Sequence, residues 1–164
     1  FVGDSSLSKR PMHRVTDHLK KMGCKISLTN NENLPLTIRG SNTILPLTHK
    51  ISKPSAQIKS AIILAALNSN GETTIIEPRQ TRNHTELLLK YLNVNYKSYR
   101  IASGGKKLIF NGPYEIRSKN ILVSLPFSSI IRFGPGVELT AILEFLLNSL
   151  LIGWLPALTC FHIG

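Results

Sequence analysis

The sequence predicts an α/β or α+β fold, in which a β-sheet packs against helices, and three observations support this prediction. A segment of the chain is repeated, because Arg10 and Arg82, and likewise Gly40 and Gly112, are 72 residues apart (82 − 10 and 112 − 40). Helix-like and strand-like segments alternate in the same order within each copy, and short loops join them. A fixed period indicates a structural unit that is used repeatedly, so equivalent loops are expected in equivalent places. Two further pairs with this spacing are Ile38 with Phe110 and Pro54 with Pro126.

The first copy is predicted to open with a loop and a helix. Pro11 suits the first helical turn, where its missing N–H is not needed, and Gly23 suits a helix C-terminus. Between them, residues recur at helical spacing; these are Val15, His18, Leu19 and Met22. Two strand-like runs follow, at 25–28 and 34–39, and the second alternates like a half-buried strand.

A second helix is predicted over 56–67, after the polar segment 52–55. Its apolar face consists of Ile58, Ile62, Ala65 and Ala66. A strand over 73–76 and a loop over 78–80 come next, and then the second copy begins. The elements expected in that copy are a helix at 86–92 and strands at 94–99 and 107–111.

The pattern changes after Val123. Residues 124–131 can still be aligned with 52–59, but from Arg132 onward the repeat vanishes. We therefore expect a domain of about two repeat units over residues 1–123 and a divergent apolar tail over 124–164. Residues 141–161 have the length of a membrane-spanning helix, although polar and helix-breaking residues argue against one; these are Glu144, Asn148, Gly153 and Pro156. The abrupt loss of periodicity favours a non-native tail, such as the product of a frame shift.

Composition indicates a partner that carries negative charge. Twenty Lys and Arg face nine Asp and Glu, which gives a net charge of +11 and a pI near 10.0. Such an excess attracts nucleic acid, anionic lipid or phosphorylated metabolites, and a merely solvated basic surface is the alternative. Cys24 and Cys160 form no metal-ligand spacing with the histidines, so we expect no metal and a cytoplasmic location. The chain opens without a secretory signal, in a segment typical of a strand end, and is expected to be a fragment.

Three loops combine hydrogen-bond donors with a helix start, at 9–12, 55–60 and 81–86. Free N–H groups and the helix dipole favour anions there, and an arginine fork suits carboxylate or phosphate. Each loop also has a simpler interpretation, since Ser55 is an ordinary N-cap residue and Arg10 and Arg82 could be solvated. No Ser–His–acid, paired-carboxylate, zinc-spaced or glycine-rich phosphate motif is present. These loops therefore predict binding, and no catalytic residue is assigned.

Several motifs follow one another along the chain, namely Gly3-Asp4-Ser5-Ser6-Leu7, Arg10-Pro11-Met12, Leu34-Pro35-Leu36, Ser55-Ala56-Gln57-Ile58-Lys59-Ser60-Ala61, Glu77-Pro78 and Thr81-Arg82-Asn83-His84-Thr85-Glu86. Taken together, these motifs resemble the 3-phosphoshikimate 1-carboxyvinyltransferase (EPSP synthase) family over residues 1–123. The closest resemblance is to the bacterial subgroup with serine-alanine-glutamine in the second loop.

The resemblance implies a fold of repeated βαβαββ units, the inverse-barrel fold of enolpyruvyl transferases, of which this chain would hold a part. It implies transfer of the enolpyruvyl group of phosphoenolpyruvate to the 5-hydroxyl of shikimate 3-phosphate in the shikimate pathway of aromatic amino-acid biosynthesis. It also implies a monomer that needs no cofactor and no metal, and that binds neither nucleic acid nor membrane.

Five residues receive roles through this resemblance. Arg10 matches the arginine that binds phosphoenolpyruvate, and Gln57 matches the glutamine that contacts both substrates. Ser55 matches a residue that grips shikimate 3-phosphate through its hydroxyl, and Ala56 one that does so through its backbone. Arg82 matches an arginine near shikimate 3-phosphate.

The sequence also departs from the family pattern. His13 stands where the family has glycine, and Ser128-Ser129 survive in a loop whose glycine and aspartate are missing. After Ile131 nothing matches, and the family's other substrate-binding loops are absent, so this chain alone is expected to be inactive. One alternative is a noncatalytic basic nucleic-acid-binding module. The chain has few aromatic residues and no basic stripe along a helix, and both observations argue against this alternative. The other is a membrane-anchored domain.

Overall fold

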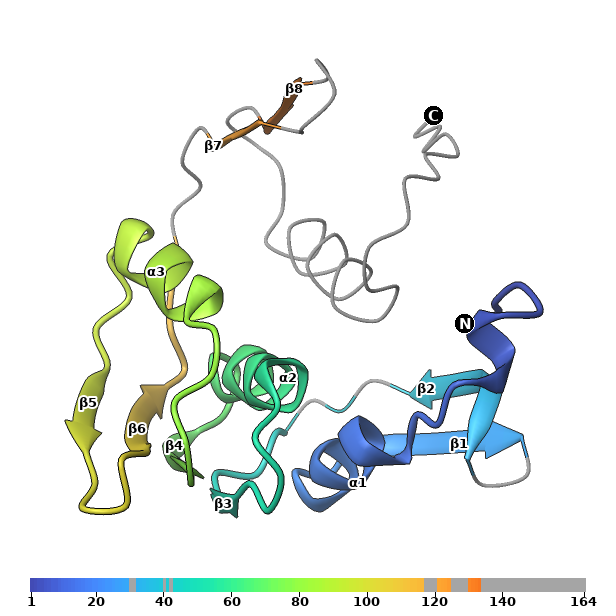
Figure 1. The fold of residues 1–164 in the computed structure, drawn as a ribbon, viewed down its shortest axis with the longest axis horizontal. Helices are drawn as coiled ribbons and strands as arrows, with labels where there is room; N and C mark the ends of the chain where they lie inside the picture. The colour runs from blue at the N-terminus through green and yellow to red at the C-terminus, as the bar shows by residue number, and fades with distance from the viewer. Residues whose placement is uncertain (30–31, 40, 42, 117–120, 125–129, 134–164) are drawn as a thin grey trace.

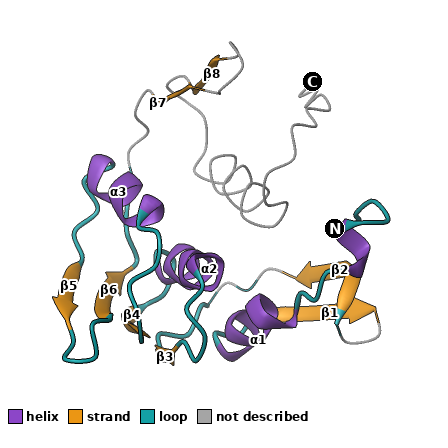
Figure 2. Ribbon diagram, in the orientation of Figure 1, coloured by secondary structure: helices purple, strands orange, loops and turns teal. Residues whose placement is uncertain are grey.

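The computed structural model describes residues 1–29, 32–39, 41, 43–116, 121–124 and 130–133. Figures 1 and 2 show the helices and strands. In chain order they are η1 (Leu7–Lys9), α1 (His13–Lys21), β1 (Lys25–Thr29), β2 (Asn33–Arg39), β3 (Thr48–Lys50), α2 (Ala56–Ala66), β4 (Gly71–Glu77), α3 (His84–Tyr91), β5 (Lys97–Arg100), β6 (Lys106–Gly112), β7 (Ile121–Ser124) and β8 (Ile130–Phe133). The predicted alternation of helices and strands is confirmed. Pro11 lies just outside α1, since Met12 is the N-cap residue, so its placement in the first helical turn was wrong.

The strands of the described residues form three sheets. β1 pairs with β2, β7 pairs with β8, and the largest sheet has the order β3-β4-β6-β5. In that sheet β3 and β4 are parallel and are joined through α2, whereas β6 runs antiparallel to both β4 and β5. A parallel pair requires such a crossover connection. Because β3 and β4 are parallel, their C-terminal ends lie at the same edge of the sheet, and the segment after β3 leads from this edge into α2.

The predicted repeat is visible in the element order, because α1-β1-β2 recurs as α3-β5-β6. Both helices end in a left-handed residue, Gly23 with φ 95° and Asn93 with φ 60°. After each, the next N–H reaches back to a carbonyl in the last turn, from Cys24 to Leu19 and from Val94 to Leu89. These bonds, with Gly23 N to Lys20 O and Asn93 N to Lys90 O, define a Schellman motif in both copies.

The start of the chain follows the same repeat. Phe1 exchanges two backbone hydrogen bonds with Leu36 of β2, at 2.7 and 3.0 Å. In the second copy Leu108, which lies 72 residues after Leu36 (108 − 36), pairs with Ile75 of β4. Phe1 therefore pairs with β2 where β4 pairs with β6 in the next unit, although residues 1–4 form no strand.

A strand of the described residues lies where the repeat predicts a second copy of α2. Alignment of 124–131 with 52–59 implies a helix start near residue 128, but Ile130–Phe133 is the strand β8, paired antiparallel with β7. The proposed tail beyond residue 133, with its candidate membrane helix over 141–161, lies outside the described residues. Within the described residues, no helix is both long enough and apolar enough to cross a membrane. The division of the chain at residue 123 stays a prediction.

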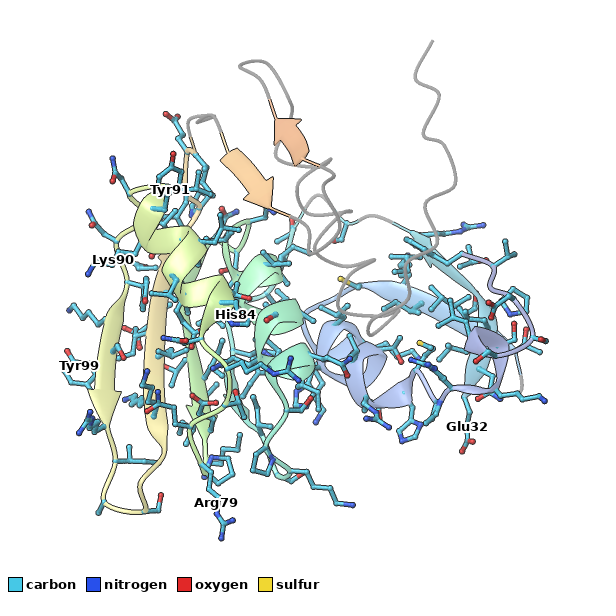
Figure 3. The ribbon with its side chains drawn as sticks, turned by 45° about the horizontal axis from the view of Figure 1, so that its top comes forward. Glu32, Arg79, His84, Lys90, Tyr91 and Tyr99 are labelled. Atoms are coloured by element: carbon cyan, nitrogen blue, oxygen red, sulfur yellow. The ribbon has the colours of Figure 1, made fainter. Side chains whose placement is uncertain are left out.

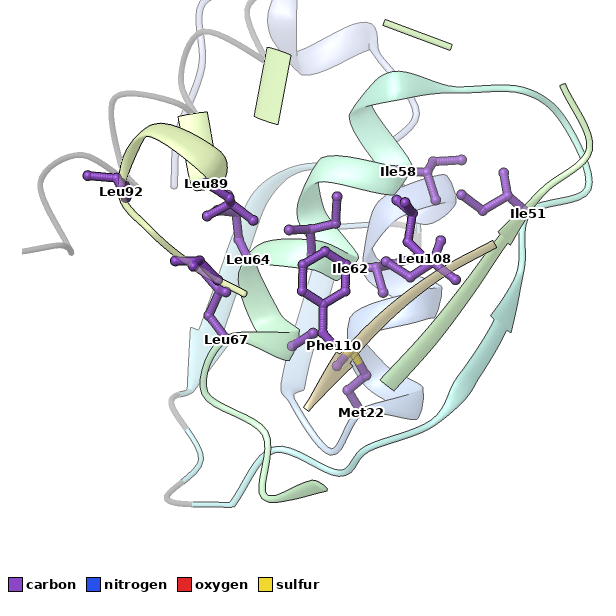
Figure 4. Packing of buried hydrophobic residues seen from close by; sticks show 14 residues of the cluster. Met22, Ile51, Ile58, Ile62, Leu64, Leu67, Leu89, Leu92, Leu108 and Phe110 are labelled. Atoms are coloured by element: carbon purple, nitrogen blue, oxygen red, sulfur yellow. The ribbon is translucent and has the colours of Figure 1, made fainter. Parts of the chain in front are cut away.

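The main core is built around α2, which is buried on nearly all sides (Figure 4). Of the predicted apolar face, Ile58, Ile62 and Ala66 are buried and Ala65 is half-buried. Ile63 and Leu64 on the opposite side are buried as well. α2 is covered by α1, by β4 and β6 of the sheet, and by Leu89 and Leu92 at α3. A helix that is apolar all round is typical of a protein interior. A second, smaller core contains Met12, Leu34 and Leu36.

Two histidines meet where α1 lies beside β3. The Nδ1 atoms of His18 and His49 are 3.2 Å apart, and His49 is only 3% exposed. The pKa of His49 is lowered to about 4, first by burial and then by His18 and Lys21. The pKa of His18 is also lowered, mainly by burial and further by Lys21, against an opposing effect of Asp17. Both imidazoles are therefore neutral in the folded chain at pH 7.

We expect the folded chain to lose stability as the pH falls from 6.5 to 4. Unfolded His49 titrates at its ordinary pKa of 6.5, so the unfolded state binds more protons within this window. Above pH 6.5, protonation of His49 does not reduce the free energy of unfolding. Near pH 4 it lowers the free energy of unfolding by about 2–3 kcal/mol. Urea unfolding at pH 7 and pH 4.5 measures the loss. His49→Gln should weaken the dependence on pH, whereas the exposed control His84→Gln should not; equal pH slopes for parent and His49→Gln would contradict the assignment.

Candidate functional site

The first turn of α2 carries three of the predicted binding residues. Ser55 is the N-cap residue in extended conformation (φ −150°, ψ 116°), and its Oγ accepts a hydrogen bond from the N–H of Ile58 at 3.4 Å. The N-cap interpretation of Ser55 is thereby confirmed. Ala56 and Gln57 follow as the first two helical residues, and all three predicted residues are half-buried. The first N–H groups of an α-helix have no carbonyl of their own helix to bind. This turn can receive an anion or a hydroxyl.

Arg82 lies in the loop between β4 and α3. Glu77, the last residue of β4, holds this loop because its Oε2 accepts from the Thr81 N–H at 3.2 Å and the Thr81 hydroxyl at 2.9 Å. Arg82 is exposed, and Asn83 is the N-cap residue of α3 without a side-chain cap. His84 is exposed at the start of α3, beside α2 in Figure 3. The loop thus presents a guanidinium at a second helix start.

Arg10 lies in the connection between η1 and α1. Asp4 Oδ1 accepts from the N–H groups of Ser6 and Leu7, at 3.0 and 2.7 Å, and so fixes the start of η1. After Arg10 the chain is anchored by Met12, which is 5% exposed and donates its N–H to Glu32 O at 2.7 Å. Arg10 itself is exposed. Its loop is therefore held at both ends while the side chain reaches solvent.

A buried ionic network connects the first two of these segments. Lys59 of α2 is 0% exposed, and its Nζ lies 3.3 Å from Oε1 of Glu77 and 2.7 Å from Oε1 of Glu86 in α3. The side chains of Glu77 and Glu86 are 1% and 5% exposed. Ser60 and Thr85, the sequence neighbours of Lys59 and Glu86, are also in contact, with hydroxyl oxygens 2.6 Å apart. The starts of α2 and α3 are thus joined by two adjacent polar contacts.

The charges of this network are unequal, with one ammonium group facing two carboxylates. Glu86 lies in the first turn of α3, where the helix dipole favours a negative charge. Its contact with Lys59 is close, but neither of its carboxylate oxygens has a hydrogen-bond partner of good geometry within the described residues. Lys59 lies in the first turn of α2, where the dipole disfavours a positive charge. The two carboxylates therefore keep the lysine in this position.

Sequence reasoning missed Lys59, Glu77 and Glu86 because they are far apart in the chain and lysine is rarely buried. One signal was available. Lys59 is the only charged residue of 56–66, a helix whose other residues are nearly all apolar or small. A lysine within a helix that is buried on all sides requires buried acidic partners. Glu77 directly follows the predicted strand 73–76 and Glu86 begins the predicted helix 86–92, so both were candidates for these partners.

The structure brings four of the five predicted residues into one framework. Ser55, Ala56 and Gln57 share one turn, and the loop of Arg82 is fixed to the same turn through Glu77. Arg10 belongs to the segment anchored on the smaller core. Its convergence with the other four stays a prediction. Among the described residues, no group of three His, Cys, Asp or Glu side chains could hold a metal ion.

Comparison with known proteins identifies relatives of this chain. The family model described as EPSP synthase (3-phosphoshikimate 1-carboxyvinyltransferase) matches residues 1–112. The 3-phosphoshikimate 1-carboxyvinyltransferase of Bartonella henselae is 44% identical over 121 residues, which are 74% of this chain and 27% of the relative. That of Rhizobium johnstonii is 50% identical over 90 residues, which are 55% of this chain and 20% of the relative. The chain therefore spans about a quarter of the length of such relatives.

Solved structures agree. An EPSP synthase of Acinetobacter baumannii matches with a TM-score of 0.64 at 35% identity, over 70% of this chain and 25% of that one. A second structure of EPSP synthase from this organism matches with a TM-score of 0.61 at 38% identity, over 68% and 24%. The mixed α/β fold predicted from the sequence is thus that of EPSP synthase structures, in part. The chain belongs to the EPSP synthase (3-phosphoshikimate 1-carboxyvinyltransferase) family.

Proposed function

We propose that this chain is part of an enzyme that transfers the enolpyruvyl group of phosphoenolpyruvate to the 5-hydroxyl of shikimate 3-phosphate. The products are 5-enolpyruvylshikimate 3-phosphate and phosphate. The observation that supports this most is the pairing of two helix starts, at α2 and α3, in one buried framework. Both carry the loops by which the sequence resembles the family. A chain with a net charge of +11 suits two phosphorylated substrates.

The proposed site for shikimate 3-phosphate uses the start of α2. Ser55 accepts the Ile58 N–H through its Oγ, so its own hydroxyl proton remains available to donate to a phosphate oxygen. The backbone N–H of Ala56 points out of the first turn, where an anion is favoured. Arg82 adds a guanidinium from the next helix start. The serine-alanine-glutamine sequence of this turn places the chain, in our proposal, in the bacterial subgroup with that motif.

Phosphoenolpyruvate is assigned to Arg10 and Gln57. The planar guanidinium of Arg10 can bind a carboxylate or phosphate through two parallel hydrogen bonds. The Gln57 side chain offers both a donor and an acceptor, so it can contact the two substrates together. The reaction proceeds by addition and then elimination, and its proton-transfer groups are expected outside this chain. The parent enzyme is proposed to be a cytoplasmic monomer that needs no cofactor and no metal, and that binds neither nucleic acid nor membrane.

Replacing Arg10 tests this function in a complete enzyme. In a chimera, the aligned 121 residues of this chain replace their counterparts in the Bartonella henselae transferase. We expect Arg10→Ala to lower kcat/KM for phosphoenolpyruvate by about 100-fold, because a charge-assisted pair of hydrogen bonds is lost. Steady-state kinetics with each substrate varied measures the change.

The control is Arg14→Ala, which removes an exposed arginine from α1 and should leave the kinetics unchanged. Unaltered KM and kcat in Arg10→Ala would refute the role of Arg10. The nucleic-acid alternative is tested by titrating the 164-residue chain with DNA at several salt concentrations. A dissociation constant well below about 1 μM at physiological salt would support that alternative, because the non-specific binding of a basic chain to DNA is weaker than this.

A further inference from the structure

We propose that Lys59 is a positioning residue that sets the two shikimate 3-phosphate loops against each other through Glu77 and Glu86. The inference rests on the proposed function, because the loops that it concerns are those of the proposed site. Lys59 is 0% exposed, so it acts on a ligand only through other residues.

The contacts of Lys59 reach both loops. It follows Ser55-Ala56-Gln57 within the same turn of α2, so any displacement of Lys59 displaces that turn. Its Nζ lies 3.3 Å from Glu77, whose other carboxylate oxygen holds the backbone and hydroxyl of Thr81, the residue before Arg82. Two side chains, those of Lys59 and Glu77, therefore connect the first turn of α2 to the loop that carries Arg82.

The contact with Glu86 adds a third fixed point. Nζ lies 2.7 Å from Oε1 of Glu86, which places the first turn of α3 directly against that of α2. A buried cation and its carboxylates attract each other strongly and have no solvent to replace them, so their separation is narrowly defined. Three elements, namely α2, the end of β4 and α3, converge on one ammonium group.

The neighbouring contact between Ser60 and Thr85 differs from the contacts of Lys59 in what it connects. It joins the two helices at 2.6 Å but does not reach the loop between β4 and α3. Packing of the helices can therefore persist without Lys59, whereas the hold on Thr81 and Arg82 depends on Glu77. Loss of Lys59 should therefore affect the loop that carries Arg82 more than the packing of α2 against α3, and this distinguishes a positioning role of Lys59 from a role in packing alone.

The test replaces all three charged groups with uncharged groups of similar size, as Lys59→Met/Glu77→Gln/Glu86→Gln in the chimera. No unpaired charge is left buried, so such variants commonly retain a fold. We expect KM for shikimate 3-phosphate to rise at least tenfold, with kcat within about threefold of the parent. The expected rise corresponds to misplacement of the binding loops rather than loss of a reacting group.

A second variant guards against misfolding. Thr81→Val removes one hydrogen bond to Glu77 and leaves all three charges in place. We expect KM for shikimate 3-phosphate to rise about three- to tenfold, because the net value of such a bond is modest. The control Thr37→Val makes the same exchange at an exposed position of β2 and should change neither KM nor kcat.

Hydrogen exchange in the 164-residue chain gives a readout that needs no substrate. Amides of 78–86 should exchange faster in the triple variant, with those of 60–66 unchanged. Parental KM together with parental exchange in both variants would overturn the inference, as would kcat and both KM values changing together. If instead the unsubstituted chimera is inactive, or Arg10→Ala is without effect, the proposed function fails, while exchange still tests the hold on the loop.

Discussion

Replacing Lys59 with methionine alone is expected to destabilise the folded chain by about 3–5 kcal/mol. The substitution keeps the volume of the side chain but leaves the carboxylates of Glu77 and Glu86 buried, with no cation between them. Their mutual repulsion and lost hydration then act against the folded state. Since single domains are stable by only about 5–15 kcal/mol, much of the total stability would be lost. Urea unfolding followed by circular dichroism measures the difference.

Lys90→Met provides the matched control, because it removes the same group from an exposed position of α3 (Figure 3). Its expected effect is within about 0.5 kcal/mol. Combining Lys59→Met with Glu77→Gln and Glu86→Gln should recover most of the loss, since the two buried charges are removed as well. A loss below about 1 kcal/mol in Lys59→Met would mean that the network does not hold charged groups in the folded chain.

Phe110→Ala is expected to destabilise the chain by a similar amount, about 3–5 kcal/mol. The side chain of Phe110 is 0% exposed and lies in the main core with Ile62 of α2 (Figure 4). Its ring also stacks on Tyr96, with centroids 5.1 Å apart and an interplanar angle of 20°. Truncation removes these contacts and leaves a cavity, because the surrounding sheet and helix cannot collapse fully. Urea unfolding at pH 7 measures the loss.

The repeat supplies a control for Phe110. Ile38 occupies the equivalent position 72 residues earlier (110 − 38), yet it is 41% exposed. Ile38→Ala is expected to change the free energy of unfolding by less than about 1 kcal/mol. Similar losses in the two variants would contradict the different environments that the structure gives to the two positions.

Much of the fold could be predicted because local patterns determine it. Helical spacing from Val15 to Met22 and the glycine after it predicted α1 to within about two residues of its ends. Strand register could not be predicted in the same way. Lys25 pairs with Arg39, but Lys97 pairs with Ile109, two residues short of the equivalent partner. The loop between the strands decides the register, and it differs between the copies.

The sequence shows that glycine recurs in the repeat but does not show why glycine is required. Gly112 is a repeat anchor in the sequence, and the structure explains why no side chain fits there. A Cβ on Gly112 would lie 2.6 Å from the carbonyl oxygens of Ala66 and Ser69, at the end of α2. This close approach involves residues more than 40 positions apart in the chain (112 − 69), so sequence spacing alone could not reveal it.

The parts of the site that depend on neighbouring residues in the sequence could be predicted. The parts that depend on contacts between distant segments were missed. A serine before an apolar helix indicates an N-cap, and Ser55 is one. The partners of Lys59 depend on how α2, β4 and α3 pack, which periodicity does not describe. The predicted roles of Arg10, Ser55, Ala56, Gln57 and Arg82 follow from resemblance and stay predictions until binding is measured.

The pairing of β4 with β6 has a consequence for which part of the chain can fold as a unit. β4 closes the first copy of the repeat and β6 belongs to the second, yet they share a ladder of seven residue pairs. A fragment that ended between the two copies would expose the edges of both strands. The unit joined by backbone hydrogen bonds therefore runs from β3 to β6, and it is offset from the copies that the sequence repeats.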